Sequence, residues 1–328
     1  MASPATKITQ AQIEEIVAAS KPERLSDPDK RPITGDHAAN VVQIAAWGQT
    51  ELAADHLLFP ELNGFLPGVV AGVIRQLNIR FVGAGLQAGD GDAEVARKVR
   101  QRQYAYETLL ELAINFGGME SRWLDAGERC QAVGNIRGAL GEWEAREAAE
   151  GTGSVAVAVA RRFLDRMKLV QKGASMAAKT ALRIEQALDF GKPVLLVLLE
   201  KAQAEIAANI YTRMVREGRC RFGNDYALGL RWLRHLGFEQ VSTNPVLAGL
   251  AYSDDPSLAQ TFQAEVKFHP RFAAWKAAPE KFGDEIALYA TLLALWDNLH
   301  VYRPIFFNLA GTSGGGVYGY NSESGVGV

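Results

Sequence analysis

The sequence is poor in cysteine and carries no histidine pattern typical of a metal site. Its two cysteines, Cys130 and Cys220, lie far apart and form no CxxC pair, which excludes a disulfide framework and is typical of reduced thiols in a cytosolic protein. None of the five histidines has metal-ligand spacing, so we interpret them as structural or surface residues and expect no bound metal. These histidines are His37, His56, His235, His269 and His300.

Long apolar runs and an excess of one charge are also absent. The start of the chain has no apolar stretch that could act as a signal peptide, and the most apolar run, residues 194–199, is too short to span a bilayer. With 35 basic and 37 acidic residues the formal net charge is -2, which supplies no field to attract nucleic acid or an anionic membrane. The Arg-rich run 97–107 has acidic neighbours, so we interpret it as a solvated helix face. The sequence therefore predicts a soluble, cytoplasmic protein.

Helical periodicity fills most of the chain. At 328 residues, of which 48% are hydrophobic, the chain is long enough for two domains with sizeable cores. Thr9 and Gln12 form a plausible capping box for a helix over 9–20, and a proline-rich, charged linker follows. Apolar residues at three-and-four spacing then predict helices over 36–58, 64–80, 92–116, 119–148, 153–189 and 193–217.

Two glycine-rich segments resemble nucleotide-binding loops. Residues 83–88, GAGLQA, satisfy the short dinucleotide fingerprint, but the residues before them look helical and Glu107 lies inside a further helical pattern. We therefore interpret this segment as a loop between helices. The glycine-rich tail after residue 310 lacks the Lys-Ser or Lys-Thr pair of a P-loop and is more typical of a flexible end.

The pattern changes at Gly218. Residues 218–225 predict a strand, 226–237 a helix closed by Gly237, and 238–243 a second strand. Further helices are expected near 256–267 and 280–299, and strand-like pieces at 301–311 and 314–321. Strand, helix and strand joined by short turns are typical of a parallel sheet with crossover helices. The sequence thus divides into an N-terminal helix and linker (1–35), an α-helical domain (36–217) and an α/β segment (218–328).

The second strand ends in Ser-Thr-Asn-Pro. Ser242 and Thr243 place hydroxyl groups at the end of the strand, and Asn244 offers both a donor and an acceptor. Pro245 favours extended backbone at Asn244. This group of side chains can orient a polyhydroxy ligand, although Asn-Pro is also a common turn element.

Together with FGND (222–225) and YRPIF (302–306), the stretch VSTNPVL resembles the transaldolase family over residues 220–321. The resemblance implies a (β/α)8 barrel that transfers a dihydroxyacetone unit between sugar phosphates through a lysine Schiff base, without metal or organic cofactor. It gives Asn244 a substrate-binding role with Thr243 and Ser242 beside it, and Asp225 a proton-transfer role. Asn224 replaces Asp225 if the register is shifted by one residue.

The chain also departs from the family. Tyr320 or Asn321 stands where the family has a glutamate on the third strand, and the strand that carries the Schiff-base lysine is not reached. The lysines at 267, 276 and 281 fall on predicted helices and match nothing in the family motif. Without the amine there is no covalent route, so we expect this chain to be inactive by itself.

The fold class expected is therefore a mainly α N-terminal region followed by an incomplete α/β segment resembling the first strands of a (β/α)8 barrel. A sheet of three or four parallel strands cannot close into a barrel and leaves an open edge that needs cover. The alternative is a non-enzymatic helical scaffold or self-assembling subunit, with residues 36–217 as its functional surface and a homo-oligomer as its default form.

Overall fold

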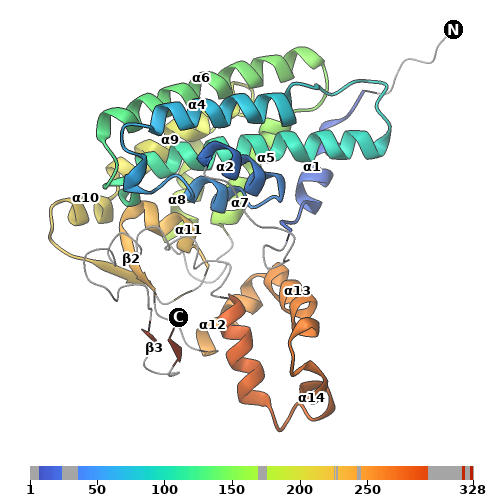
Figure 1. Cartoon of the computed structure of the whole chain (residues 1–328), viewed down its shortest axis with the longest axis vertical. Coiled ribbons are helices and arrows are strands. Elements are labelled where there is room, and N and C mark those ends of the chain that lie inside the picture. The colour runs from blue at the N-terminus through green and yellow to red at the C-terminus, as the bar shows by residue number, and fades with distance from the viewer. Residues whose placement is uncertain are drawn as a thin grey trace. The chain divides into compact units, whose positions relative to one another are not determined.

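The described residues fold mainly into helices, and β1 and β2 among them form a two-stranded parallel sheet (Figure 1). The computed structural model describes residues 7–23, 36–168, 176–224, 226, 228–241, 245–294, 320–321 and 326–327. Two compact units divide the chain: unit 1 comprises Met1–Asp165 and Arg183–Ala208, and unit 2 comprises Arg166–Leu182 and Asn209–Val328. The first helix, α1 (Gln10–Ala19), belongs to unit 1. The three-part division expected from the sequence stays a prediction.

Unit 1 is built around the long helices α5 (Asp92–Gly117) and α6 (Ala126–Glu150), which pack against each other. Helices α1, α3 and α9 also pack on α5, and α4 packs on α6 (Figure 1). The core holds large, fully buried side chains such as Tyr106, Phe116 and Trp143. The remaining helical elements of this unit are α2 (His37–Ala46), α3 (Thr50–Asp55), η1 (Pro60–Leu62), α4 (Leu66–Leu77), the π-helix η2 (Asn78–Val82), η3 (Met119–Ser121), α7 (Val155–Met167) up to residue 165, α8 (Met176–Ala187) from residue 183, and α9 (Val194–Ala208).

The predicted capping box of α1 is confirmed. The Thr9 hydroxyl accepts the Gln12 backbone N–H, and the Gln12 side chain accepts the Thr9 backbone N–H. Three of the predicted long helices each correspond to two helices. The prediction 153–189 gives α7 and α8, with residues 169–175 outside the described residues. The segment 36–58 breaks after Trp47 because Gly48 has a φ of 75°, and 193–217 breaks at Asn209, whose side chain caps α10 (Ile210–Arg216) through the Tyr211 N–H. Periodicity does not register such breaks, because the apolar stripe continues across them.

Unit 2 contains the predicted strand, helix and strand. β1 (Phe222–Asn224) and β2 (Phe238–Val241) pair in parallel, with Asn224 opposite Val241. Between them lie α11 (Leu230–Leu233) and η4 (Arg234–Leu236), closed by Gly237 with a φ of 96°. A side chain at Gly237 would also meet Val215 Cγ2 at 2.9 Å, so position 237 requires glycine for both conformation and space.

The rest of unit 2 is mostly helical. A helix that the sequence analysis did not identify, α12 (Pro245–Asp254), begins immediately after the Ser-Thr-Asn segment. The expected helices near 256–267 and 280–299 are present as α13 (Pro256–Glu265) with η5 (Val266–Phe268) and as a helix over 283–294. Between these two helices lies α14 (Phe272–Ala277).

The strand-like piece 301–311 and most of 314–321 lie outside the described residues. β3 (Tyr320–Asn321) pairs antiparallel with β4 (Val326–Gly327), and among the described residues neither joins β1 and β2. The described part of the chain therefore shows one parallel pair, and not the three or four parallel strands expected. None of its helices is long and apolar enough to cross a membrane.

Gly153 makes the closest glycine contact in unit 1. A Cβ built there would lie 2.7 Å from the Gln10 backbone, at the start of α1. We expect Gly153→Ala to lower the free energy of unfolding by about 1–3 kcal/mol, because backbone cannot move aside without displacing α1. Denaturant titration measures this change.

Gly134→Ala in α6 is the matched control, since a Cβ at that exposed position meets nothing within 4 Å. Replacing a glycine inside a helix by alanine should raise stability by about 0.5–1 kcal/mol. Equal changes in the free energy of unfolding for Gly153→Ala and Gly134→Ala would contradict the close packing of α1 against Gly153.

Candidate functional site

The residues predicted to bind substrate, Asp225, Ser242, Thr243 and Asn244, lie outside the described residues. The structure does describe the strand ends that precede them. Asn224 and Val241 are register partners in a parallel pair, so β1 and β2 end at the same edge of the sheet. Asn224 and Val241 therefore mark the carboxyl edge of the sheet, which is where α/β proteins place their ligands.

Asn224, the alternative to Asp225, has its amide engaged locally. Its Nδ2 donates to the Tyr226 carbonyl oxygen at 2.6 Å, which stabilises the turn after β1. The Tyr226 hydroxyl in turn donates to Asp254 Oδ2 at 2.5 Å, at the last residue of α12. Burial, together with the Asp254 carboxylate, raises the pKa of Tyr226, so the phenol remains a donor at neutral pH.

The three lysines considered in the sequence analysis are exposed. Lys267 lies on η5 and Lys276 in the last turn of α14. Lys281 lies in the turn before the helix over 283–294, which corrects the expectation that all three fall on helices. A Schiff-base amine usually lies in a desolvated pocket, and these positions offer none.

The described histidines pack against other aromatic rings. His235 is buried in η4, the last turn before Gly237 as predicted, and stacks edge-on against Trp232. His269 stacks on Trp275 with ring centroids 4.0 Å apart. His37 and His56 lie 5.8 Å apart in unit 1, where burial and the neighbouring imidazole lower the pKa of His56. His300 lies outside the described residues. Within the described residues, no group of three or more His, Cys, Asp or Glu side chains could hold a metal ion.

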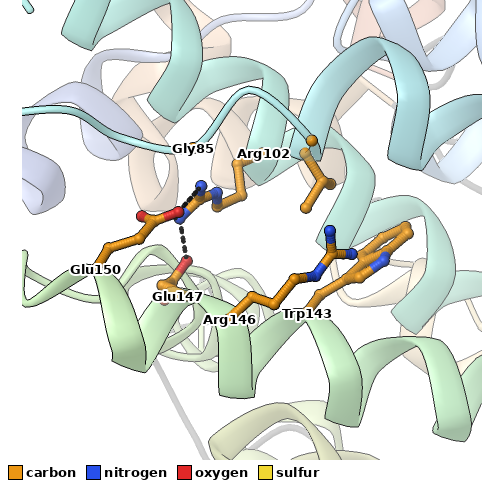
Figure 2. Close-up of a pocket in the computed structure, with 8 residues that line it drawn as sticks. Gly85, Arg102, Trp143, Arg146, Glu147 and Glu150 are labelled. Atoms are coloured by element: carbon orange, nitrogen blue, oxygen red, sulfur yellow. Dashed lines mark hydrogen bonds and ion pairs between the residues drawn. The ribbon is translucent and has the colours of Figure 1, made fainter.

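Unit 1 contains a small hollow between α5, α6 and the loop after the π-helix. Figure 2 shows Arg102 reaching from α5 toward Glu147 and Glu150 on α6, with Arg146 and Trp143 farther along α6. The hollow measures about 60 Å³, which is room for a few water molecules and too little for a sugar phosphate. It is lined by Val82, Gly83, Gly85, Arg102, Trp143, Arg146, Glu147 and Glu150.

The ion pairs of Arg102 and Glu147 are nearly inaccessible to solvent. Both side chains are 3% exposed, and Arg102 donates to Glu147 at 3.2 Å and to both oxygens of Glu150 at 2.8 Å (Figure 2). Burial alone would lower the pKa of Arg102, but the hydrogen bonds to Glu150 and the charge of Glu147 outweigh it and raise that pKa. Glu147 also accepts from Tyr106, Ser154 and the Ala156 N–H. The charged groups of this cluster thus pair with one another, and the cluster has the structural role of connecting α5 to α6.

The segment 83–88 borders this hollow and is not a dinucleotide loop. α4 and the π-helix η2 precede it in place of a strand, and Glu107 lies within α5, as the sequence analysis favoured. Gly85 has a φ of 56°, and a Cβ there would lie 3.1 Å from Glu150 Oε1. Because Gly85 has no side chain, its loop can approach the ion pair of Glu150 closely.

Sequence reasoning missed the buried ion cluster, although one signal for it exists. Val95, Val99, Arg102 and Tyr106 recur at spacings of four, three and four, so Arg102 falls on the buried stripe of α5. A charged residue on such a stripe indicates a buried partner. The interpretation of 97–107 as a solvated helix face is therefore wrong for its second half, where residues 102, 103 and 105–107 are buried. Glu147 and Glu150 supply the buried partner of Arg102.

A second buried glutamate on α6 meets the start of α9. Glu144 Oε1 accepts the Leu195 backbone N–H at 3.1 Å, in the first turn of that helix. Burial raises the pKa of Glu144 to about 7, against the lowering effect of the backbone N–H groups of α9, while Glu147 raises it further. This carboxyl group therefore titrates near neutral pH.

The raised pKa of Glu144 predicts a loss of stability with rising pH. Between the ordinary value of 4.5 and about 7 the folded chain holds the proton more tightly than the unfolded chain. The contribution of Glu144 to the free energy of unfolding is complete below pH 4.5. This contribution, about 3 kcal/mol in total, is lost as the pH rises through 7. Glu144→Gln keeps the acceptor oxygen but cannot ionise, so its stability relative to the unsubstituted chain should increase from pH 5 to pH 8.

Urea titrations across this range measure the difference. Glu142→Gln is the matched control, since Glu142 lies on the same helix with its side chain 69% exposed. That variant should follow the unsubstituted chain within about 0.5 kcal/mol at every pH. If the free energies of unfolding of Glu144→Gln and of the unsubstituted chain changed in parallel with pH, the raised pKa of Glu144 would be ruled out.

Comparison of the chain with protein-family models, with curated proteins and with solved structures finds no match.

Proposed function

We propose that the segment from Gly218 onward provides part of a sugar-phosphate site of transaldolase type, and that this chain binds the sugar phosphate without reacting with it. One observation supports the proposal above others: β1 and β2 are parallel and end in register. The residues that follow them in the chain, Asp225 on one side and Ser242, Thr243 and Asn244 on the other, carry the groups that a polyhydroxy ligand requires.

The start of α12 also supports this proposal. Pro245 is the first residue of the helix, so the Ser-Thr-Asn segment leads directly from a strand into a helix N-terminus. Backbone N–H groups at such an end favour an anionic group such as a phosphate. Strand end, hydroxyl side chains and helix start are thus consecutive in the chain.

In this proposal Asn244 and Thr243 hydrogen-bond the hydroxyl groups of the dihydroxyacetone part, with Ser242 beside them, and Asp225 is the proton-transfer group. The absence of reaction is proposed because the aldolase route needs an amine that forms an imine with the substrate carbonyl. Lys267, Lys276 and Lys281 offer exposed amines, whereas a Schiff-base amine usually lies in a desolvated pocket.

Binding of fructose 6-phosphate to the full chain tests the proposal by calorimetry. Ser242→Ala and Asn244→Ala should each weaken binding by about 5- to 30-fold, because each removes one or two hydrogen bonds to the ligand. Ser253→Ala is the matched control, since that exposed hydroxyl bonds the Gly249 carbonyl within α12. Borohydride treatment of the mixture should leave no covalent adduct by mass spectrometry. Absence of binding would refute the site, and an adduct would refute the claim that no reaction occurs.

A second candidate function concerns the helical region 36–217, which we propose as a scaffold that associates with a second copy. The observation that favours a structural role is the hollow of about 60 Å³, whose charged groups bind one another and leave no space for a metabolite. Light scattering of the full chain should then give a mass above 35.6 kDa that falls on dilution. A strict monomer at all concentrations would exclude self-association.

A further inference from the structure

Helices α2 and α3 form a hairpin that is closed by the turn at Gly48. Gly48 has a φ of 75°, and a Cβ there would lie 3.1 Å from the Tyr104 side chain, so this turn requires glycine. At the opposite end, His37 in the first turn of α2 meets His56, which follows the last residue of α3. Their ring centroids lie 5.8 Å apart, with 48° between the ring planes. The two imidazoles therefore form a contact at the open end of the hairpin.

The environment of His56 favours a neutral imidazole. The ring is half-buried and packs edge-on against Phe59, with ring centroids 6.4 Å apart. Its Nε2 is buried, and no hydrogen-bond partner for this atom lies among the described residues. A neutral imidazole can carry its proton on Nδ1 and leave Nε2 bare, but an imidazolium carries an N–H on both nitrogens. Protonation of His56 would thus create a buried N–H without a partner, which is unfavourable.

The charges around the pair act in the same direction. Burial and then the His37 imidazole lower the pKa of His56, because two cations at this distance repel each other. The other charged side chains of α2, α3 and the adjoining faces of α4 and α5, with the N-cap of α2 included, are Asp36, Glu51, Asp55, Arg75, Glu107 and Glu111. These groups do not offset the lowering of the pKa of His56.

We propose that the contact between His37 and His56 is an acid-sensitive switch, which keeps α2 on α3 while both imidazoles are neutral and releases the open end of the hairpin when they are protonated. Its contribution to the free energy of unfolding is complete above pH 6.5 and is lost as the pH falls, because the unfolded chain takes up the proton of His56 more readily. Glu144 has the opposite pH dependence, so the two effects are separable. The residues of the switch belong to unit 1, and the inference is independent of the sugar-phosphate site.

Hydrogen exchange of the full chain, followed by mass spectrometry at pH 5 and pH 8, tests the switch. After correction for the intrinsic effect of pH on exchange, the protection of amides 38–55 should fall by about 5- to 10-fold at pH 5. Amides 106–116 of α5 serve as the internal reference and should change by less than about 2-fold. An unchanged protection of amides 38–55 at pH 5 would overturn the proposal.

Three variants identify the group that titrates. His56→Phe keeps an aromatic ring beside Phe59 but cannot be protonated, so the loss of protection at pH 5 should disappear. His37→Gln changes an exposed side chain and removes the second cation, so the loss should fall to less than about half of that in the unsubstituted chain. His269→Gln is the matched control, because this histidine stacks on Trp275 in unit 2, and it should show the full loss.

The outcomes for the two switch residues are read separately. A loss of protection in His56→Phe as large as in the unsubstituted chain would overturn the proposal, because the titrating group would then lie elsewhere. If His56→Phe does not fold, His37→Gln decides the question, and a full loss in that variant would overturn the proposal as well.

Discussion

The buried carboxylate of Glu147 holds three helices of unit 1 together. It binds Arg102 of α5 and the Ala156 N–H in the first turn of α7 from its own place on α6. Loss of the Arg102 charge would leave the Glu147 carboxylate buried without its guanidinium partner, which costs several kcal/mol in proteins. The alignment of α5 and α6 is therefore constrained by charge as well as by apolar packing. Gly85, where a Cβ would lie 3.1 Å from Glu150 Oε1, lets its loop lie close to this ion pair.

One turn before Glu147 on α6, Glu144 makes the same kind of contact with the start of α9. A carboxylate at a helix N-terminus satisfies backbone N–H groups that have no partner within the helix, so α6 contributes caps to both α7 and α9. The two glutamates differ in their environment. Glu147 is compensated by a guanidinium group, while burial and the neighbouring Glu147 carboxylate raise the pKa of Glu144 to about 7, although the backbone N–H groups of α9 lower it.

Unit 2 uses polar contacts differently, at the ends of its elements. Asn224 closes a turn and Tyr226 reaches the end of α12, so the polar groups surround strand ends and are only partly buried. Charged groups of unit 1 that are fully engaged with one another favour a structural role for the helices, and a held strand edge in unit 2 favours ligand binding. The proposal of a sugar-phosphate site in the second unit rests on the parallel strands β1 and β2, which end in register.

Local chemistry makes much of the helical structure predictable. α5 over Asp92–Gly117 agrees with the predicted 92–116, and β1, α11 and β2 agree in order and direction with the predicted strand, helix and strand. The breaks at Gly48 and Asn209 were not predicted, because apolar periodicity continues through both. The helix α12 was missed because an Asn-Pro turn signal was interpreted as a loop, although proline is well suited to the first position of a helix.

The sequence by itself thus determined most of the helical segments, the capping box of α1, and which polar residues follow each strand, since these depend on neighbours in the chain. Only the tertiary structure decided that Arg102 is paired with Glu147 and Glu150, that Glu144 caps α9, and that Tyr226 bonds Asp254. Those contacts join residues far apart in sequence. Their energies depend on burial, which no local pattern of residue types specifies.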